Sequence, residues 1–511
     1  MRELDRRAVV DHALPVRALM EVAAAALAER ALVLRDGQGP AIFLCGGGHN
    51  GGDGLAAARH VAAAGVAAEV FLWAEPDRLS EAPAANLALL AATPVTVKVR
   101  PDIQALAGRL ATAGVVVDCL LGTGFRGGVR APLAEVIAAI NGCGRPVLAA
   151  DIPSGLTGEP GEAPDGPCVQ ASVTLCFGAV KAGLLAPPGR CWAGEVGCAP
   201  LGIPEAAWQG LDILEGLEDA TVVPLLPARS GTGHKGTYGT VLTVGGAVGF
   251  AGAAALCAEG ALRAGCGLSQ VVCPAPVQPT VAGLLREATV QPLPADAEGM
   301  LAAEAASSAV LGARLAVADV LAVGPGLGRG LGVPEVLRHL LRVFTGPLVL
   351  DADGLNAVDL PAIAMARGSV VITPHPGEAA RLLGCATATV QADRLAAVRN
   401  LAASGRCVAV LKGAGTLTAT AAGAVALCPT GNDGMGTGGS GDVLTGVIAG
   451  LLAQGAAPWN AARAGVYVHG RAGDLAKDAV GRRALLAGDI LAHLGAAFAH
   501  LAAGASGAFP A

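Results

Sequence analysis

Residues 437–442 read Thr-Gly-Gly-Ser-Gly-Asp, and the apolar run Val-Leu-Thr-Gly-Val-Ile follows directly at residues 443–448. Glycines and a serine that lead into apolar residues predict a loop that opens a helix, here over residues 439–454. Backbone N–H groups and the helix dipole attract an anion at such a place, and Asp442 in the first turn adds a carboxylate. A phosphate cradle with a carboxylate suits hydroxyl activation beside a nucleotide. The alternative is an ordinary glycine-rich turn, with Asp442 as an N-terminal helix charge.

Composition limits the classes of protein that remain. A chain of 511 residues predicts two or more domains, and with aromatics at 3% the core must consist mainly of Ala, Val and Leu. The net charge of −6, without a run of Lys or Arg, argues against a nucleic-acid partner. No apolar stretch reaches about 18 residues without a charge or a helix breaker, which argues against a membrane span.

The N-terminal residues lack the apolar centre of a signal peptide. The 13 cysteines are scattered and include no Cys-x-x-Cys pair. This usage indicates reduced thiols that serve as small buried hydrophobic side chains. We therefore expect a cytoplasmic protein.

Short β-rich runs alternate with alanine-rich helical runs, which predicts an α/β fold with mostly parallel strands. In the first half, strands are expected at 41–45, 68–73, 95–99, 115–118, 146–150 and 172–176, and helices at 14–34, 55–64 and 131–140. In the second half, strands are expected at 237–244, 268–273, 319–323, 347–350, 369–372 and 407–411, and helices at 439–454, 459–477 and 484–501. Prolines and acidic residues between the halves predict a domain of 1–210, a linker of 211–224 and a domain of 225–511.

Three polar segments follow strands of the first half. They are the glycine-rich segment 46–54, the loop 122–128 after the strand that ends near Asp118, and the segment that starts at Asp151 and contains Ser154. Gly-x-Gly-x-x-Gly occurs three times in the chain, so the bare pattern is weak and its place after a strand is the useful part. Asn50 and these three oxygen-bearing residues could hold a hard cation. Alternatively, Asn50 and Asp53 form turns, and Asp118 and Asp151 cap helices.

These segments together resemble the NAD(P)H-hydrate epimerase family over residues 1–205. The likeness rests on Asn-Gly-Gly-Asp-Gly-Leu, on Asp-x-Leu-Leu-Gly-Thr-Gly-Phe-Arg-Gly and on Asp-Ile-Pro-Ser-Gly, in that order. It implies a Rossmann-like three-layer domain, with a potassium ion bound by Asn50, Asp118 and Ser154. It further implies that Asp151 transfers a proton and that Lys181 supplies charge nearby. The implied hydrate-binding residues are His49, Asn50, Gly51, Gly52, Asp53, Gly122, Thr123, Gly124, Phe125, Arg126, Gly127, Gly128 and Asp151.

Two residues depart from that family's pattern. His49 stands where the family usually has the first Asn of Asn-Asn-Gly-Gly-Asp. Its imidazole can still donate to an oxygen, but its charge depends on pH. Val22 stands where the family has the Asn of Met-Glu-Asn-Ala-Gly. Epimerase activity is therefore the less secure of the two expected activities.

Six polar segments follow one another along the second half. They lie at 234–239, 324–328, 351–356, 373–378, 412–416 and 432–442. This succession resembles the ribokinase-like fold and, more narrowly, the ADP-dependent NAD(P)H-hydrate dehydratase family over residues 225–500. One departure is Asn-Asp-Gly-Met-Gly at 432–436 where the family has Asn-Pro-Gly-Met-Ala, which would loosen the loop without removing a reacting group.

The resemblance implies a role for each matched residue. Asp442 would be the base that takes the proton of the hydrate hydroxyl, and the amides of Gly439, Ser440 and Gly441 would form the anion hole. Gly326, His375 and Asp442 would contact the hydrate, and Glu378 would organise magnesium through water. The nucleotide would lie against Lys412, Gly413, Ala414, Gly415, Thr416 and Gly441. His375 in a turn and Glu378 as a solvated charge are the ordinary alternatives.

The two resemblances together predict a bifunctional enzyme, both isomerase and lyase, for metabolite repair. Its partners would be NADH hydrate, NADPH hydrate and ADP, with K⁺ and Mg²⁺, in a homo-oligomer. One domain would exchange the R and S epimers, and the other would phosphorylate the S form and eliminate phosphate. A kinase of a small alcohol with a non-catalytic first half is the alternative. A nucleotide-sensing scaffold and an NAD-dependent dehydrogenase are further rivals, although the latter needs an acidic residue at the end of the second strand, and Glu69 lies inside it.

Overall fold

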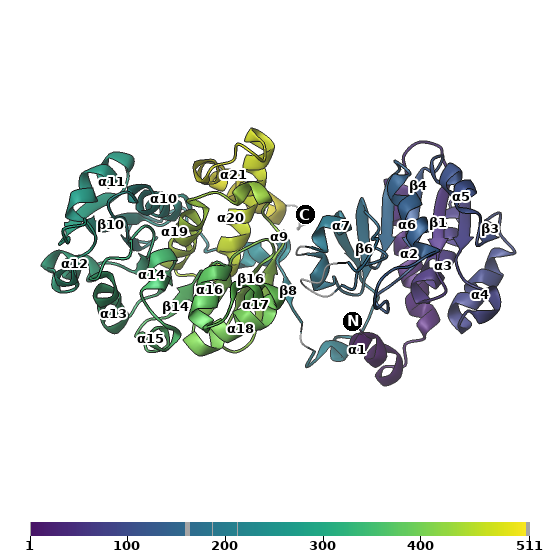
Figure 1. Cartoon of the computed structure of the whole chain (residues 1–511), viewed down its shortest axis with the longest axis horizontal. Helices are drawn as coiled ribbons and strands as arrows, with labels where there is room; N and C mark the ends of the chain where they lie inside the picture. Colours follow the sequence, from purple (N-terminus) through teal and green to yellow (C-terminus); the bar gives the residue numbers. More distant parts are fainter. Residues whose placement is uncertain (1, 159–163, 186–187, 212, 507–511) are drawn as a thin grey trace. The chain divides into compact units, whose positions relative to one another are not determined.

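The computed structural model describes residues 2–158, 164–185, 188–211 and 213–506. The chain divides into two compact units, Met1–Ile213 and Leu214–Ala511, here called unit 1 and unit 2 (Figure 1). Each unit has its own sheet with helices around it, so the predicted α/β class is confirmed. No described helix is long and apolar enough to cross a membrane.

Unit 1 is built on a seven-stranded sheet in the order β3-β2-β1-β4-β5-β6-β7. Every pairing in it is parallel. The strands are β1 (Ala41–Cys45), β2 (Ala68–Leu72), β3 (Thr96–Val99), β4 (Val115–Cys119), β5 (Val147–Ala150), β6 (Val173–Phe177) and β7 (Glu195–Ala199). The helices are α1 (Arg2–Arg6), the π-helix η1 (Arg7–Asp11), α2 (Val16–Leu34), α3 (His49–Ala63), α4 (Glu81–Leu90), α5 (Ile103–Leu110), α6 (Leu133–Gly142), α7 (Arg190–Ala193) and α8 (Glu205–Trp208).

Helices cover both faces of this sheet and make three layers. Phe43 of β1 points to the face that α2 and α3 cover, where it packs with Leu27 and Leu55. Its neighbour Ile42 points to the other face and packs with residues of α5 and α6, such as Leu106. Successive side chains of a strand point to opposite faces, so a strand buried on both faces reads as a continuous apolar run. This is why Ala41–Cys45 shows no polar alternation.

The glycine-rich segment after β1 is helical, not a loop. The sequence predicts a helix at 55–64, whereas α3 begins at His49. A Cβ on Gly51 would lie 1.9 Å from the carbonyl oxygen of Gly46, and one on Gly52 would lie 2.8 Å from the Met20 side chain. Close packing of the first turns against their surroundings therefore requires these glycines and overrides their low helix propensity. It also brings His49, Asn50 and Asp53 onto one helix face.

Unit 2 is built on a ten-stranded sheet in the order β11-β10-β9-β12-β13-β14-β15-β16-β17-β8. Pairings from β11 to β15 are parallel, those of β16 with β15 and β17 are antiparallel, and β8 is parallel to β17. The strands are β8 (Glu215–Gly216), β9 (Thr240–Val244), β10 (Leu268–Pro274), β11 (Thr289–Leu293), β12 (Val320–Val323), β13 (Leu348–Leu350), β14 (Val370–Ile372), β15 (Val408–Leu411), β16 (Thr416–Ala419) and β17 (Val425–Cys428).

The helices of unit 2 differ widely in length. They are α9 (Asp219–Val222), α10 (Ala251–Arg263), α11 (Gln278–Leu284), α12 (Ala309–Leu315), α13 (Val333–Val343), α14 (Ala352–Asn356), α15 (Leu360–Ala364), α16 (Pro376–Leu383), α17 (Thr387–Ala392), α18 (Arg394–Gly405), α19 (Ser440–Ala453), α20 (Pro458–Val480) and α21 (Ala487–Ser506). A Cβ on Gly446 of α19 would lie 2.0 Å from the Cys257 carbonyl oxygen of α10. One on Gly450 would lie 2.5 Å from the Ala261 carbonyl oxygen. Backbone packs on backbone where α10 and α19 cross.

The stretch that the sequence predicts as a linker is largely part of unit 2. Glu215–Gly216 forms β8 at the edge of the sheet, and Arg463 Nη1 lies 2.6 Å from Glu215 Oε1. Leu217 and Val222 are buried in the core of unit 2. The division between the units therefore falls at residues 213 and 214, inside the predicted 211–224 stretch.

Candidate functional sites

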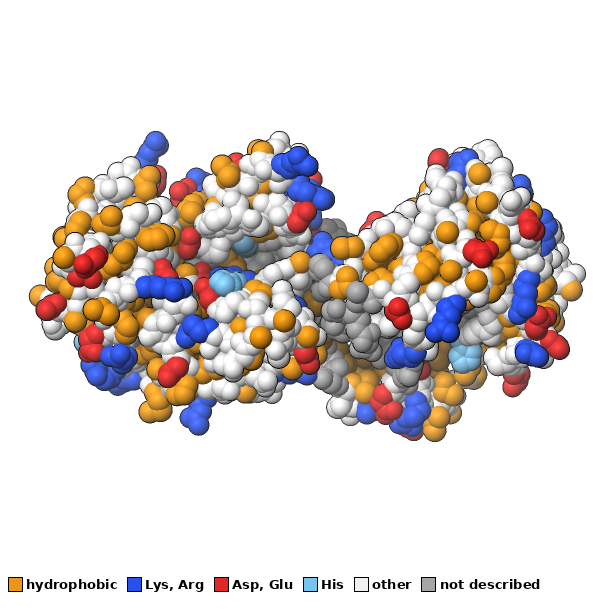
Figure 2. All heavy atoms as spheres, in the orientation of Figure 1, with side chains coloured by type: hydrophobic (Ala, Val, Ile, Leu, Met, Phe, Trp, Pro, Cys, Tyr) orange, Lys and Arg blue, Asp and Glu red, His pale blue; other side chains and the backbone are white. Residues whose placement is uncertain are grey.

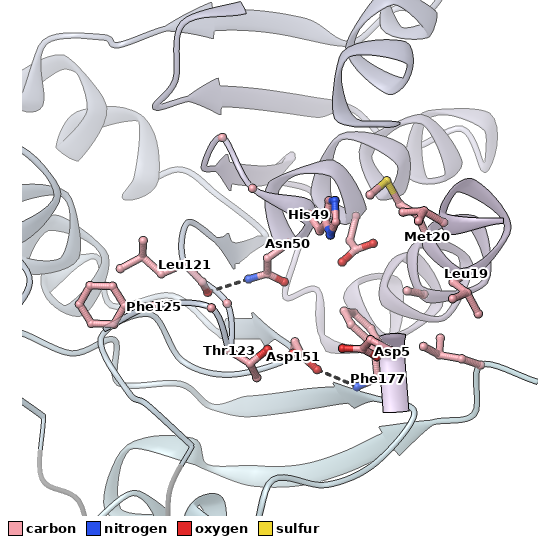
Figure 3. Close-up of a pocket in the computed structure, with 18 of the residues that line it drawn as sticks. Asp5, Leu19, Met20, His49, Asn50, Leu121, Thr123, Phe125, Asp151 and Phe177 are labelled. Atoms are coloured by element: carbon pink, nitrogen blue, oxygen red, sulfur yellow. Dashed lines mark hydrogen bonds between the residues drawn. The ribbon is translucent and has the colours of Figure 1, made fainter. Parts of the chain in front are cut away.

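Unit 1 has a cavity of 560 Å³ at the carboxyl ends of its central strands (Figure 3). Its wall includes the segments that follow β1, β4 and β5, and Phe177 at the end of β6. Helix α2 contributes Leu19 and Met20 to the wall, and α1 contributes Asp5. Of the predicted site residues, the wall contains His49, Asn50, Asp53, Gly122, Thr123, Gly124, Phe125 and Asp151. It does not contain the predicted Gly51, Gly52, Arg126, Gly127 and Gly128.

An oxygen-rich cluster forms beside this cavity from Asn50, Asp118, Ser154 and the Leu121 backbone. The hydroxyl of Ser154 donates to Asp118 Oδ1 at 2.6 Å, and its amide donates to Asp118 Oδ2 at 2.8 Å. Asn50 Nδ2 donates to the Leu121 carbonyl oxygen at 2.8 Å. Burial raises the pKa of Asp118 to about 6, although these hydrogen bonds from Ser154 oppose the shift.

The amide oxygen of Asn50 has no hydrogen-bond partner among the described residues of this cluster. Asn50 Oδ1 is buried, and no hydrogen bond to it is found among the described residues. An unpaired buried oxygen is costly, and it usually marks an unseen water or ion. Nearby are a fully buried carboxylate, a hydroxyl and a carbonyl, so the donor set suits a cation with oxygen ligands. The three potassium ligands predicted from the sequence are therefore brought together.

Asp151 follows β5 in a strained backbone conformation, with φ at +64°. The amide of Phe177 donates to Asp151 Oδ1 at 3.0 Å (Figure 3), and the buried ammonium of Lys181 donates to the same oxygen. Lys181 Nζ also lies 3.3 Å from the Phe177 carbonyl oxygen. Non-glycine residues in this conformation cluster at functional sites, because surrounding contacts must hold them there.

Val22 and His49, the two departures from the family pattern, lie at different kinds of place. His49 is exposed at the cavity wall. The side chain of Val22 is 44% exposed, and Val22 is not part of the wall, whereas Met20 on the same helix is. The loss of an Asn at position 22 therefore does not remove a group from the described cavity.

A buried charge cluster occupies the carboxyl ends of β13 and β15 in unit 2. Lys412 Nζ donates to Asp351 Oδ1 at 2.6 Å, and Thr445 of α19 donates to Asp351 Oδ2 at 2.8 Å. The Asp351 side chain is 1% exposed. Burial alone would lower the pKa of Lys412, but Asp351 and then Glu378 raise it more. The cluster thus holds the Lys412 ammonium close to Gly441. A Cβ added to Gly441 would lie 3.1 Å from Lys412 Nζ.

Asp442 lies in the first turn of α19, as predicted. Burial is the main reason why the pKa of its carboxyl rises to about 7, and repulsion by Asp351 adds to the shift. Lys412 opposes it. A carboxylate whose pKa lies near neutrality is suited to act as a general base.

The start of α19 is held from two sides. Gly439 is its N-cap, with φ at +94°, a left-handed conformation that glycine adopts without strain. The Ser440 hydroxyl donates to the Met435 carbonyl oxygen at 2.9 Å, and His469 Nε2 lies 2.9 Å from the Ser440 carbonyl oxygen. Burial lowers the pKa of His469 to about 4, so this imidazole is neutral and donates. Gly439, Ser440 and Gly441, the residues predicted to form an anion hole, thus lie at the start of this helix, where an anion is favoured.

His375 and Glu378 form a capping box at the start of α16. The Gly377 amide donates to His375 Nδ1 at 3.0 Å, and the His375 amide donates to Glu378 Oε2 at 2.8 Å. The His375 side chain is 57% exposed, whereas that of Glu378 is 8% exposed. Figure 2 shows unit 2 hollowed on this face between α16 and α20, with histidine and acidic side chains in the hollow. The exposed His375 side chain is therefore accessible to a ligand. Glu378 is largely buried and also caps the start of α16.

The loop 412–416 follows β15 and Gly326 follows β12, so both lie at carboxyl ends of the same sheet, with β13 and β14 between them. Gly413 and Gly415 both have positive φ, at +141° and +66°. Arg394 Nη2 donates to the Leu411 and Lys412 carbonyl oxygens at 3.2 and 3.3 Å. These hydrogen bonds hold the backbone at the start of the turn. Ala414 and Thr416 belong to the same turn, at whose end β16 begins.

The structure adds four residues to the unit 2 site that were not assigned to it from the sequence. Asp351 pairs with Lys412 and accepts a hydrogen bond from Thr445. His469 contacts the Ser440 carbonyl oxygen at the start of α19. Arg394 donates to carbonyl oxygens of Leu411 and Lys412 beside the loop 412–416. Only Asp351 carried a usable signal, because it follows a strand directly. The other three are recognised through contacts between elements distant in sequence.

The fold and the sites together define the class. Unit 1 is a Rossmann-like three-layer unit with a cavity and an oxygen cluster. Unit 2 is a ribokinase-like α/β unit with a glycine-rich helix start and the largely buried carboxyl of Asp442 in its first turn. Family comparisons match residues 241–495 to NAD(P)H-hydrate dehydratase and residues 16–183 to the YjeF-related protein N-terminus.

Individual relatives match nearly the whole chain. The bifunctional NAD(P)H-hydrate repair enzyme Nnr of Moorella thermoacetica is 41% identical over 503 residues, covering 96% of this chain and 94% of the relative. The enzyme of the same name from Coxiella burnetii is 38% identical over 496 residues and covers 97% of each. The ADP/ATP-dependent NAD(P)H-hydrate dehydratase of Bacillus subtilis, co-crystallised with ATP and Mg²⁺, is 31% identical at a TM-score of 0.50. It covers 57% of this chain and 100% of its own.

The chain belongs to the family of bifunctional NAD(P)H-hydrate repair enzymes. The resemblance stated from the sequence is confirmed for both halves.

Proposed function

We propose that this chain repairs hydrated nicotinamide cofactors by two successive reactions. Unit 1 exchanges the R and S epimers of NADH hydrate and NADPH hydrate. Unit 2 returns the S form to NADH or NADPH with ADP as phosphoryl donor. The observation that carries the proposal is Asp442, whose carboxyl has a pKa raised to about 7, mainly by burial. It lies in the first turn of α19, and a helix N-terminus favours a phosphate.

The dehydration needs a better leaving group than hydroxide. Asp442 removes the proton of the hydroxyl on carbon six, and the oxygen attacks the terminal phosphorus of the nucleotide. The amides of Gly439, Ser440 and Gly441 and the Lys412 ammonium stabilise the charge on the transferring phosphoryl group. Elimination of phosphate then restores the dihydronicotinamide ring. His375 and Gly326 lie where the hydrate would be held, and the loop 412–416 where the nucleotide would be held.

Magnesium fits this site only indirectly. Among the described residues, no group of three or more His, Cys, Asp and Glu side chains is arranged to hold a metal ion. Glu378 Oε2 accepts a hydrogen bond from the His375 amide, and Glu378 Oε1 lies 3.4 Å from His375 Nε2. Glu378 would hold magnesium through water, and the ion would neutralise negative charge on the nucleotide phosphates.

Potassium is assigned to the Asn50, Asp118 and Ser154 cluster of unit 1. The unpaired Asn50 Oδ1 supports this choice, because a cation would satisfy it. Its charge would favour the ionised form of Asp118 and fix the loop that follows β4 at the cavity wall.

We place the protein in the cytoplasm. Most of its cysteines, including Cys45, Cys119 and Cys257, are buried thiols in the sheets and helices that form the cores. Such thiols are typical of a reducing compartment.

The activities are tested by incubating the protein with both epimers of NADH hydrate, Mg²⁺, K⁺ and either ADP or ATP while NADH is followed by absorbance. Full recovery with ADP supports both activities and the donor. Recovery that stops at the share of one epimer points to an inactive unit 1. A stable phosphorylated product with ATP would favour the alternative, a kinase of a small alcohol.

The dehydratase should lose activity in acid because its base becomes protonated. With the pKa of Asp442 raised to about 7, mainly by burial, the ionised fraction falls about tenfold for each pH unit below 7. We expect kcat/KM for dehydration to rise with pH and level off above about pH 7. Initial rates from pH 5 to 9 on pure S epimer give the profile. A profile flat down to pH 5 would contradict the assignment.

Epimerisation should depend on potassium through the Asn50 amide. Asn50→Leu keeps the size of the side chain but removes the oxygen, so we expect stimulation by K⁺ to fall by about tenfold or more. Epimer exchange is measured in KCl against choline chloride at equal ionic strength. Dehydratase activity of unit 2 in the same sample should not change, and thermal unfolding followed by circular dichroism shows whether unit 1 is folded. An unaltered response to K⁺ would remove Asn50 from the ion site.

A further inference from the structure

Two carboxyl groups line the unit 1 cavity, the buried Asp53 and the partly buried Asp151, and they come from different walls. Asp151 belongs to the wall formed by the ends of β5 and β6, and Asp53 lies on α3. Figure 3 shows His49 and Asn50 of α3 across the cavity from Asp151 and Phe177. Asp53 follows Asn50 by three residues, so it lies on the same helix face. A flat ring between these walls would have one carboxyl on each side.

The surroundings of the two groups differ. Asp151 Oδ1 accepts hydrogen bonds from the Phe177 amide and from the Lys181 ammonium, its ion-pair partner. Asp53 is 9% exposed, and no described residue donates a hydrogen bond to it. Burial is the main cause that raises the pKa of Asp53 well above its usual value, and the charges of Asp151 and Asp5 add to the shift while Lys181 opposes it. Asp53 is thus the carboxyl that keeps a proton.

We propose that Asp53 is the proton donor of epimerisation, that Asp151 receives the proton of the incoming water, and that the carbon–oxygen bond at carbon six is the bond that breaks. This inference rests on the proposed epimerase function of unit 1. It assigns chemistry to Asp53 beyond contact with the hydrate.

The reaction balances as follows. Asp53 gives its proton to the hydroxyl on carbon six, and the carbon–oxygen bond breaks so that water leaves with the bonding pair. The lone pair of ring nitrogen one forms a double bond to carbon six, and the ring becomes a cation. Water then attacks carbon six from the face of Asp151, passes a proton to that carboxylate, and nitrogen one regains its lone pair. The reverse conversion uses the same two groups with their roles exchanged.

The charges of the cavity favour this route over opening of the ring. With Asp53 protonated, Asp151 and Lys181 cancel, and Asp5 contributes a negative charge at the wall. Once Asp53 has given its proton to the leaving water, Asp53 is negative as well, and these negative charges stabilise a ring that carries one positive charge. Cleavage of the carbon–nitrogen bond would give a neutral aldehyde, which gains nothing from such a cavity. The pairing of one protonated with one ionised carboxyl is a general pattern of acid–base sites.

Oxygen exchange tests the route. The pure R epimer of NADH hydrate is incubated with the whole protein, K⁺ and water enriched in ¹⁸O, without nucleotide, and the S epimer is analysed by mass spectrometry at short times. We expect one ¹⁸O for each molecule of S formed above the uncatalysed background. S epimer that retains its original oxygen would overturn the route. Absence of any epimer exchange by the unaltered protein would instead contradict the proposed function.

Variants test the two carboxyl groups separately. Asp53→Asn and Asp151→Asn should each slow epimerisation by about 100-fold or more, with ¹⁸O incorporation lost in parallel. Asp77→Asn, which removes an exposed carboxyl of unit 1 that does not line the cavity, should change the rate by less than about fivefold. Thermal unfolding of each variant, followed by circular dichroism and compared with the unaltered protein, shows whether unit 1 is folded. If Asp53→Asn epimerised at the unaltered rate, Asp53 would not be the proton donor.

Discussion

Replacing Asp442 with Asn should lower the dehydration rate by about 1000-fold and leave epimer exchange unchanged. The amide has the size of the carboxyl but cannot accept the hydroxyl proton. The anion hole would persist, because the positive φ of Gly439 and the contacts of Ser440 do not involve the Asp442 side chain. Single-turnover recovery of NADH from the S epimer with ADP measures the step directly.

The same variant carries an internal control, because it should be more stable than the unaltered protein. Burial and the neighbouring Asp351 hold the pKa of Asp442 at about 7 in the folded chain, against 3.8 in an unfolded one. The folded state therefore binds the proton more tightly, and stability is lost as pH rises from about 4 to 7. Asn removes this loss, so the melting temperature should increase more at pH 8 than at pH 5. A variant that was inactive and less stable at pH 8 would indicate misfolding.

Replacing Lys412 with Met should cause the largest loss of stability, about 3–5 kcal/mol. Asp351 is 1% exposed and would lose its ammonium partner, and the nearby carboxyls of Asp442 and Glu378 would lose the same positive charge. Dehydration should also stop, because the phosphate cradle would lose its fixed cation. Chemical denaturation monitored by circular dichroism gives the change in the free energy of unfolding.

A second substitution separates structure from chemistry at this ion pair. Asp351→Asn combined with Lys412→Met removes both charges and should restore much of the stability, but not the dehydration. Lys477→Met is the matched control, because Lys477 pairs with Asp478 at 3.2 Å on the surface and such pairs contribute little. Equal losses from the Lys412 and Lys477 variants would contradict the buried-pair interpretation.

Buried parallel strands could be predicted from the sequence, and so could the edge strand β3 at 95–99, whereas the edge strands β7 and β11 were missed. The run 41–45 coincides with β1, because a strand covered on both faces is apolar throughout. β11 contains Pro292, and β7 is only partly buried, so neither has a continuous apolar signature. The antiparallel strands β16 and β17 were missed because a short run of Thr and Ala predicts no strand without its partner.

The site was predicted where a polar residue directly follows a strand, and less well where a helix start is involved. Asn50 and Asp53 were expected in a loop and lie in α3, because glycines that pack against neighbouring chain segments look the same in sequence as glycines that turn. Asp351 was recognised as part of a polar segment but not as the partner of Lys412. That pairing depends on β13 and β15 lying in one sheet with β14 between them, which only the topology shows.

The close packing of α10 against α19 limits which substitutions can raise the melting temperature of this protein. Exchanging helical glycines for alanine is a common route to higher melting temperature, since it reduces the freedom of the unfolded chain. At Gly446 and Gly450 the added methyl group would collide with the backbone of α10 and push α19, with its anion hole, away from the sheet. Gly488 and Gly495 of α21 have no atoms within 4 Å of the added carbon. A thermostable version should therefore be sought on α21, while the glycines beneath the anion hole stay as they are.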